Sequence, residues 1–390
     1  MSLSRSSFGS VCHLVNGKAF KPTDWSGVGV PIIRIQNLNG PDRPFNYWAG
    51  ALDNQVLVKT GDLLLAWSGT PGTSFGAHIW SGPNGILNQH IFRCDLDQKA
   101  ITKEWARIAV NHRLYRLIEQ AHGGVGLQHV TRGMVEDLEI PLPPLPEQRR
   151  IADVLDRAEA LRARRRAALA QLDSLTQSLF LDLFGDPKSN PKAWLPKSMA
   201  ELFAASPIFG TMIPPVTEKR GWLSLRVGNI QDWNLDLSDQ KYVDLPSASV
   251  ERHSVKDGDL LLARAIASQD HLGKCVIAHP NGAQWAFDSH LMRLRFDLKQ
   301  TEPEFVRYLL MTPGGRSIFL RASRKSTVQF NINTKEISAL RIPVPPIELQ
   351  REFARRVRAV EKLKTAQRAS LAELDALFTT LQHRAFRGEL

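Results

Sequence analysis

The sequence predicts an α+β protein in which two globular mixed α/β domains are separated by two long helices, packed as an antiparallel coiled coil with pseudo-two-fold symmetry. Three observations predict this fold. The chain of 390 residues repeats itself in order over most of its length, and each copy begins with a region rich in Gly, Pro and short apolar runs. Each copy then ends in a long segment without Gly or Pro. A chain of this length also exceeds the usual size of one domain.

Four segments of the first half return in the second half in the same order. They are IIRIQNL at 32–38 and SLRVGNI at 224–230, VKTGDLLLA at 58–66 and VKDGDLLLA at 255–263, LNQHIFR around His90 and FDSHLMR around His290, and PLPPLPEQRR at 141–150 and PVPPIELQRE at 343–352. Their spacing rises only from 192 to 202 residues, as expected if the second copy carries small loop insertions. A period this long predicts domain-sized copies rather than the short units of a solenoid.

The two globular domains are expected at 1–144 and 187–346. Short strand-like runs such as DLLLAW and DLLLAR follow Gly-Asp turn signals at Gly61 and Gly258, which favours a mixed fold with many loops. A short helix is expected at Lys103–Glu119. Its counterpart at Pro303–Leu320 should be interrupted by Pro313-Gly314-Gly315.

Long spacer helices are expected at 145–186 and 347–390. Residues 147–184 and 347–387 contain neither Pro nor Gly, and glycines follow both segments. At 1.5 Å per residue, each helix would be roughly 57 Å long. Because domain termini tend to lie close together, the second helix should run back along the first.

Steps of three and four residues predict an apolar seam on each helix, with polar residues in the middle. Polar seam positions commonly fix the register of a coiled coil. The expected seams are Ile151, Val154, Ala158, Leu161, Arg165, Ala168, Leu172, Leu175 and Leu179, and Phe353, Val357, Val360, Lys364, Gln367, Leu371, Leu374, Phe378 and Leu381.

The charge balance points to a polyanionic partner. Lys and Arg number 50 against 39 Asp and Glu, which leaves a formal charge of +11. Such an excess favours nucleic acid or an anionic membrane surface. No apolar run is long enough to span a membrane, and no signal-peptide segment is apparent. Three widely spaced cysteines argue against disulfides or structural zinc and fit a reducing cytoplasm.

Motifs for catalysis are absent from the sequence. There is no phosphate-binding G-x-x-x-x-G-K-[ST] loop, no H-E-x-x-H metal motif, no methyltransferase motif and no nuclease cluster. HGGVG at 122–126 is better interpreted as a turn, and His90 and His290 as structural histidines. We therefore expect no catalytic residue, no metal site and no cofactor bound by this chain.

Two similar modules on a rigid spacer suit a DNA target that is split into two halves. Lys and Arg would contact phosphates, while Arg, Asn and Gln on loops would contact base edges. Candidate DNA-binding residues in the first copy are Arg34, Gln36, Asn37, Trp67, Ser68, Thr70, Thr73, Ser74, Gln128 and His129. Those in the second copy are Arg226, Asn229, Arg264, Ser268, Gln269, Arg321, Arg324, Lys325, Gln329 and Asn331.

Structural interpretations compete with several of these assignments. Arg34, Asn37, Arg226 and Asn229 occur in both copies, so they could equally hold the scaffold. The loops at 67–76 and 264–273 differ directly after an almost identical strand, which makes them the better candidates for specificity. The basic run LRARRR at 161–166 could face DNA, bind an acidic partner surface or be solvated.

The order of globular domain, long helix, globular domain, long helix resembles the specificity subunit of type I restriction–modification systems. The resemblance covers essentially the whole chain. It rests on IPLPPLPEQRRIADVLD after the first domain, IPVPPIELQREFARRV after the second, and the terminal LQHRAFRGEL. The second copy departs slightly, with Glu348-Leu349-Gln350 in place of Pro146-Glu147-Gln148.

The resemblance implies a non-catalytic subunit whose two target recognition domains each read one half of a bipartite double-stranded DNA target. The paired helices would act as a ruler for the spacer and dock methyltransferase subunits, here through Gln148, Arg149, Gln350 and Arg351. S-adenosylmethionine, ATP and Mg would belong to the methyltransferase and restriction/translocase subunits.

Three alternatives compete with this interpretation. A free-standing sequence-specific DNA-binding protein would have no methyltransferase partners, which co-purification would reveal. A subunit of a type IIB-like or fused enzyme would carry a cryptic catalytic role, which methyl transfer by the isolated chain would reveal. A purely structural coiled-coil protein would leave the two Trp-containing globular domains unexplained.

Overall fold

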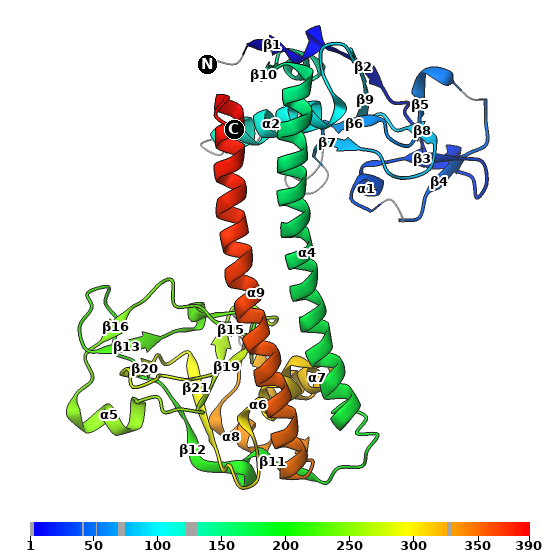
Figure 1. Cartoon of the computed structure of the whole chain (residues 1–390). Coiled ribbons are helices and arrows are strands. Elements are labelled where there is room, and N and C mark those ends of the chain that lie inside the picture. The colour runs from blue at the N-terminus through cyan, green and yellow to red at the C-terminus, as the bar shows by residue number, and fades with distance from the viewer. Residues whose placement is uncertain (1–3, 41–42, 52, 69–74, 122–130, 326–329) are drawn as a thin grey trace. The chain divides into compact units, whose positions relative to one another are not determined.

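The computed structural model describes residues 4–40, 43–51, 53–68, 75–121, 131–325 and 330–390, with only the backbone described for 115–121 and 324–325. The chain forms two compact units. Unit 1 comprises Met1–Arg165 and Ser370–Leu390, and unit 2 comprises Arg166–Ala369. Each unit combines a globular α/β part with a stretch of both long helices (Figure 1). No helix in the described part of the chain is long and apolar enough to cross a membrane.

Unit 1 contains two four-stranded sheets, ordered β2-β9-β6-β7 and β4-β3-β8-β5, and a separate β1-β10 pair. Its strands are β1 (Arg5–Ser7), β2 (Cys12–Asn16), β3 (Val30–Ile33), β4 (Asn46–Trp48), β5 (Leu57–Val58), β6 (Leu63–Ala66), β7 (Gly76–Ile79), β8 (Gly85–Leu87), β9 (Ile91–Leu96) and β10 (Glu139–Pro141). Its helices are α1 (Ile35–Leu38), α2 (Lys103–Ala121), α3 (Arg132–Glu136), the start of α4 (Leu145–Phe184) and the end of α9 (Ile347–Arg387).

Unit 2 contains sheets ordered β12-β21-β17-β19, β16-β13-β20 and β18-β23-β22, and the pairs β11-β24 and β14-β15. Its strands are β11 (Pro196–Ser198), β12 (Phe203–Phe209), β13 (Trp222–Leu225), β14 (Ile230–Gln231), β15 (Asn234–Leu235), β16 (Tyr242–Val243), β17 (Leu260–Ala263), β18 (Ala265–Ile266), β19 (Cys275–Ile277), β20 (Trp285–Phe287), β21 (Leu291–Phe296), β22 (Arg324–Lys325), β23 (Phe330–Asn331) and β24 (Arg341–Pro343). Its own helices are α5 (Ser247–His253), α6 (Pro303–Met311), α7 (Pro313–Ala322) and α8 (Thr334–Ala339).

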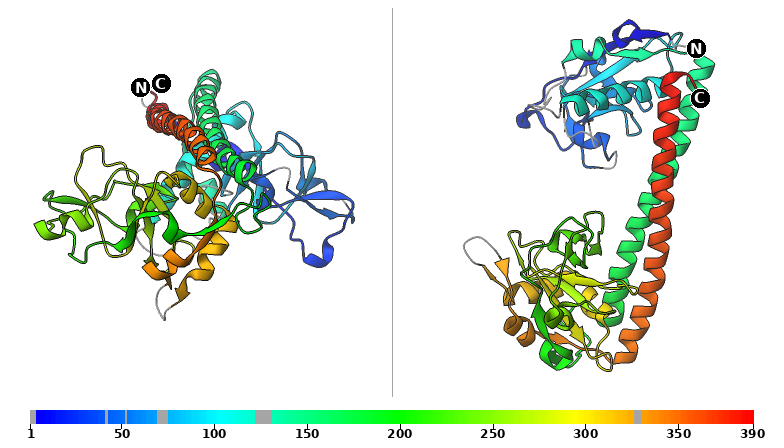
Figure 2. Two further views of the ribbon diagram at one scale, coloured as in Figure 1. Left: turned by 90° about the horizontal axis from the view of Figure 1, so that it is seen from below. Right: turned by 90° about the vertical axis from the view of Figure 1, so that its left-hand side faces the viewer.

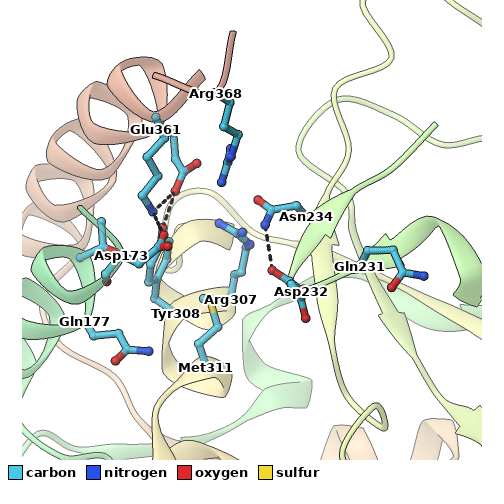
Figure 3. A pocket seen from close by; sticks show the side chains of 12 residues that line it. Asp173, Gln177, Gln231, Asp232, Asn234, Arg307, Tyr308, Met311, Glu361 and Arg368 are labelled. Carbon is cyan, nitrogen blue, oxygen red and sulfur yellow. Dashed lines mark hydrogen bonds and ion pairs between the residues drawn. The ribbon is translucent and has the colours of Figure 1, made fainter. Parts of the chain in front are cut away.

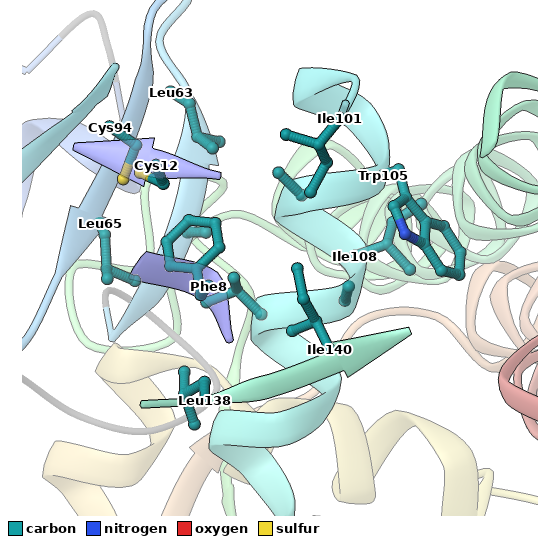
Figure 4. Packing of buried hydrophobic residues seen from close by; sticks show 14 of the residues in the cluster. Phe8, Cys12, Leu63, Leu65, Cys94, Ile101, Trp105, Ile108, Leu138 and Ile140 are labelled. Carbon is teal, nitrogen blue, oxygen red and sulfur yellow. The ribbon is translucent and has the colours of Figure 1, made fainter. Parts of the chain in front are cut away.

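The repeated LLLA run is the central strand of the main sheet in each unit, β6 in unit 1 and β17 in unit 2. Successive side chains of a strand point to opposite faces. Leu63 and Leu65 accordingly pack in one core cluster with α2, whereas Leu64 and Ala66 pack in another against the second sheet. Both faces of the strand are therefore buried, which explains why the run is apolar throughout. Figure 4 shows the first of these clusters, with α2 packed against the sheet.

The helix after the main sheet differs between the units as the sequence predicted. Helix α2 of unit 1 is continuous, but its counterpart is divided into α6 and α7. The hydroxyl of Thr312 accepts the Gly315 N–H at 3.1 Å and caps α7, with Pro313 at its first position. A Cβ on Gly315 would lie 1.9 Å from the Leu309 carbonyl oxygen, so the tight break requires glycine.

Helices α4 and α9 confirm the two predicted long helices, and they pack antiparallel within each unit. In unit 1 Arg162 pairs with Asp375, and Ile151 lies in the same core cluster as Ala385. In unit 2 Asp173 pairs with Lys364, and the Phe180 and Phe353 rings lie 5.5 Å apart. Numbers rise along one helix as they fall along the other, which defines the antiparallel direction.

The predicted seam residues of α9 are all buried or half-buried, but the prediction for α4 is partly wrong. Leu161 and Leu175 are 48% and 52% exposed, so they do not face α9. The positions that follow them make the contacts: Arg162 lies over the Phe378 ring at 4.3 Å, and Thr176 is 2% exposed. At the helix ends the predicted positions Ile151 and Leu179 do pack in or against the cores, beside Leu155 and Phe180.

Candidate nucleic-acid interface

The glutamines at the starts of α4 and α9 are buried anchors of the scaffold. Gln148 is 0% exposed; its Oε1 accepts the Thr102 N–H at 2.8 Å, and its Nε2 donates to the Ala100 and Pro143 carbonyls, both at 2.8 Å. Gln350 is equally buried and makes the matching bonds in unit 2: Oε1 accepts the Glu302 N–H at 3.0 Å, and Nε2 donates to the Gln300 and Pro345 carbonyls.

This burial argues against the partner-binding role expected for Gln148 and Gln350. Both side chains are 0% exposed, and both N–H donors of each amide are bonded inside the fold, so neither side chain presents a donor to another protein. The neighbouring arginines are different. Arg149 is exposed, and Arg351 is 43% exposed while pairing with Glu348 at 2.8 Å.

The repeated asparagines Asn37 and Asn229 are also buried within the fold, at 0% and 3% exposure. Asn37 Oδ1 accepts the Arg34 N–H at 3.1 Å, and Asn229 Oδ1 accepts the Arg226 N–H at 3.0 Å. These bonds close the turn after β3 and after β13, so the structure favours the scaffold interpretation for both asparagines.

The arginines of the same turns, Arg34 and Arg226, already make contacts inside the fold. Arg34 donates to Asn46 at 3.3 Å and lies over the Trp25 ring at 5.1 Å. Arg226 pairs with Asp239 at 2.9 Å, which holds the pKa of that carboxyl below its usual range. Gln36 lies in the first of these turns, between Arg34 and Asn37. Its side chain is exposed and remains available for contact.

Two candidate segments that are distant in sequence meet in unit 2. Strand β18 follows Arg264 directly and pairs with β23, where Ala265 lies opposite Asn331. Strand β22, which contains Arg324 and Lys325, pairs with the other edge of β23. Ala265–Ile266, Arg324–Lys325 and Phe330–Asn331 therefore form one small three-stranded sheet, ordered β18-β23-β22, which joins the strand after Arg264 to the strand that contains Asn331.

Arg316 fixes the loop at 264–273, a role that the sequence did not reveal. Its guanidinium donates to the Leu272 carbonyl and to the Gln269 carbonyl, the latter at 2.6 Å. Leu272 is fully buried, so the loop is anchored in the core as well. In the sequence this arginine only follows a Pro-Gly-Gly break, and no pattern connected it with a loop more than forty residues earlier.

The equivalent region of unit 1 is described only at its ends. Trp67 packs against His90 with ring centroids 5.4 Å apart, and Ser68 is half-buried. At the other end, Asn111 of α2 accepts the Ala77 N–H at 2.7 Å and donates to the Ala77 carbonyl at 2.9 Å. The remaining candidates lie outside the described residues: Thr70, Thr73, Ser74, Gln128, His129 and Gln329.

A polar pocket of about 470 Å³ lies in unit 2 among α4, α6, α9 and the β14-β15 hairpin (Figure 3). Lys364 is 4% exposed, and its Nζ lies 2.8 Å from both Asp173 Oδ1 and Glu361 Oε1. Burial opposes the charge on Lys364, but the hydrogen bonds to Asp173 and Glu361 prevail and raise its pKa. Tyr308 also donates to Glu361 at 3.1 Å. Because these charges bond to one another, the pocket fixes the register of α4 and α9 in this unit.

The described residues include neither a metal-ligand cluster nor an exposed cysteine. Among them, no three His, Cys, Asp or Glu side chains gather as a metal site would require. Cys12, Cys94 and Cys275 are buried free thiols, and burial raises the pKa of Cys275 to about 12. Polar side chains project from loops that are fixed on a packed scaffold, and binding or catalytic residues often lie on such loops.

Comparison with known proteins shows which proteins this chain is similar to. A family model for the type I restriction modification DNA specificity domain matches residues 5–171. The EcoBI specificity subunit of Escherichia coli is 26% identical over 99% of this chain and 86% of its own length. The EcoKI specificity subunit of E. coli K12 is 24% identical over 71% of this chain and 63% of its own.

Solved structures share the fold. An S subunit of a type I restriction–modification system from M. genitalium matches with a TM-score of 0.63, covering 98% of this chain and 96% of its own at 14% identity. The sequence matches bear out the resemblance noted above: the family model covers residues 5–171, and the chain as a whole is similar to type I specificity subunits.

Proposed function

We propose that this chain is the sequence-specific DNA-binding subunit of a type I restriction–modification enzyme, and that its two units each read one half of a bipartite target. The single observation that carries the proposal is the repeated scaffold. Each unit has a four-stranded main sheet that contains the repeated LLLA strand, and each fixes the start of a long helix through a buried glutamine. The excess of positive charge supports binding to DNA phosphates.

In this proposal the chain carries no catalytic centre, and methyl transfer and cleavage belong to partner subunits. S-adenosylmethionine, ATP and Mg would bind to those partners. The exposed sides of α4 and α9, including Arg149 and Arg351, are the surfaces proposed for methyltransferase docking, whereas Gln148 and Gln350 act from inside the scaffold. The paired helices set the length of the spacer between the half-sites.

The decisive experiment maps N6-adenine methylation in the source genome with and without this gene. One asymmetric bipartite motif should lose its methylation when the gene is deleted and regain it on complementation. An unchanged methylation map would overturn the proposal. Co-purification of methyltransferase subunits separates it from a free-standing DNA-binding protein, and labelled S-adenosylmethionine given to the isolated chain should yield no methylated DNA.

A further inference from the structure

Arg264 of unit 2 is held at both its backbone and its side chain. Its N–H donates to the His290 carbonyl at 3.0 Å, and its carbonyl accepts the Ile332 N–H at 2.9 Å. Its Nε donates to the Ser289 carbonyl at 2.8 Å. The guanidinium also lies over the Phe209 ring at 4.0 Å. These contacts fix the plane and the direction of the guanidinium.

The donors at the end of this side chain have no partner among the residues that the structure describes. An arginine guanidinium has five N–H donors in a planar fork, and only the Nε donor of Arg264 is bonded within the described part of the chain. No carboxylate there pairs with it, since the nearby Asp288 bonds to His290 at 3.3 Å. Burial lowers the pKa of Arg264, because removing its charged guanidinium from water costs free energy. A fixed, half-buried cation with free donors favours an acceptor that arrives with a ligand.

The equivalent position in unit 1 holds a different kind of side chain. Trp67 follows the same LLLA strand, and its N–H donates to the His90 carbonyl at 3.4 Å, as that of Arg264 does to His290. The backbone geometry is thus shared, while the side chain changes from an indole to a guanidinium. A position with a common scaffold and a different side chain is where two modules would read different bases.

We infer that Arg264 is a specificity-determining residue that reads a guanine in the half-site bound by unit 2, an inference that rests on the proposed function. Arginine donates to guanine O6 and N7 in the major groove through two parallel hydrogen bonds. The Nη1 and Nη2 groups of Arg264 can make this pair without breaking the Nε bond that orients them. Asn331 lies opposite Ala265 in the small sheet, one residue along the chain from Arg264.

The test uses the complex of this chain with its methyltransferase subunits. The probe is a set of duplexes in which each base pair of the methylated target is replaced in turn. The wild-type complex should discriminate on the order of 10- to 100-fold against replacement of one G·C pair in the unit 2 half-site. Arg264→Ala should lose discrimination at that pair alone and keep it at every other position.

Three variants separate the possible outcomes. Arg264→Met retains an aliphatic stem over Phe209 and should behave like Arg264→Ala, so that loss of folding is not mistaken for loss of readout. Arg264→Lys should recover only part of the discrimination, because lysine lacks the planar fork. Arg220→Ala, which removes an 80% exposed arginine from the same unit, should match the wild type.

Two results would overturn the inference. One is an Arg264→Ala complex that binds every duplex more weakly by the same factor and whose salt dependence is shallower by about one unit, since this identifies a phosphate contact. The other is unchanged discrimination at all positions. A wild-type complex without any sequence preference would instead contradict the proposed function.

Discussion

The ammonium group of Lys364 in α9 lies 2.8 Å from the carboxylate of Asp173 in α4, although the lysine is only 4% exposed. A polar residue at a seam position sacrifices apolar burial but fixes the register of two helices. Here the lysine also bonds to Glu361, which in turn accepts the Tyr308 hydroxyl. The two long helices of unit 2 are therefore aligned by a network that reaches into the globular part.

Removal of Lys364 should destabilise unit 2. Lys364→Ala leaves two carboxylates close together without their cation, and because Asp173 is 64% exposed, we expect a loss of about 1–3 kcal/mol of unfolding free energy. Urea unfolding followed by circular dichroism measures it. Lys362→Ala, at an exposed position of the same helix, is the control. Equal stability of the two variants would show that the network does not contribute.

The buried glutamines should contribute to stability rather than to partner affinity. Gln148→Ala leaves the Thr102 N–H and two carbonyls without their partner, which should cost about 1–3 kcal/mol. Arg149→Ala, its exposed neighbour, should leave stability unchanged. Urea midpoints and methyltransferase binding are measured on both variants. Weaker binding by a Gln148→Ala protein of normal stability would restore the partner-contact interpretation.

The turn asparagines should behave as scaffold residues. Asn229 donates to the Asp236 and Asp239 carbonyls and accepts the Arg226 N–H, so Asn229→Ala removes three buried hydrogen bonds. We expect a stability loss of about 1–3 kcal/mol, whereas Gln36→Ala in the exposed part of the corresponding turn should change stability little. A stable Asn229→Ala protein with altered target preference would argue for a DNA contact instead.

His253 should make unit 2 less stable in acid. Burial, with the nearby charges of Arg252 and Arg293, lowers its pKa in the folded protein. The unfolded chain binds the proton near pH 6.5, at a pH where the folded protein does not. Stability is therefore complete above that pH and is lost as the pH falls below it. The advantage of the wild type over His253→Gln should shrink from pH 7.5 to 5.5; a difference independent of pH would contradict this.

Longer helices should lengthen the preferred spacer of the target. Four residues inserted after Arg165 in α4 and after Ala369 in α9 add about 6 Å to each helix. We expect the spacer to grow by one or two base pairs, as a survey of methylated sites would show. Insertion in α4 alone misaligns the seam and should mainly destabilise the protein. An unchanged spacer with both insertions would contradict the ruler role.

The sequence determined the outline of this protein because its strongest signals are local and repeated. The absence of Gly and Pro predicted α4 and α9, and the LLLA runs predicted β6 and β17, since helix breakers and apolar runs act at the level of the backbone. The duplication predicted two matching scaffolds. These features do not depend on which distant residues meet.

Only the tertiary structure decided which side chains are available for contact. Gln148 and Gln350 have the polarity of surface residues, yet the start of each long helix packs them against carbonyls far away in sequence. Leu161 and Leu175 have the polarity of core residues, yet the anchoring of α4 turns them outward. Arg264 acquires its fixed direction from Phe209, Ser289 and Ile332. Burial and hydrogen bonding between distant segments are set by packing, which no local pattern encodes.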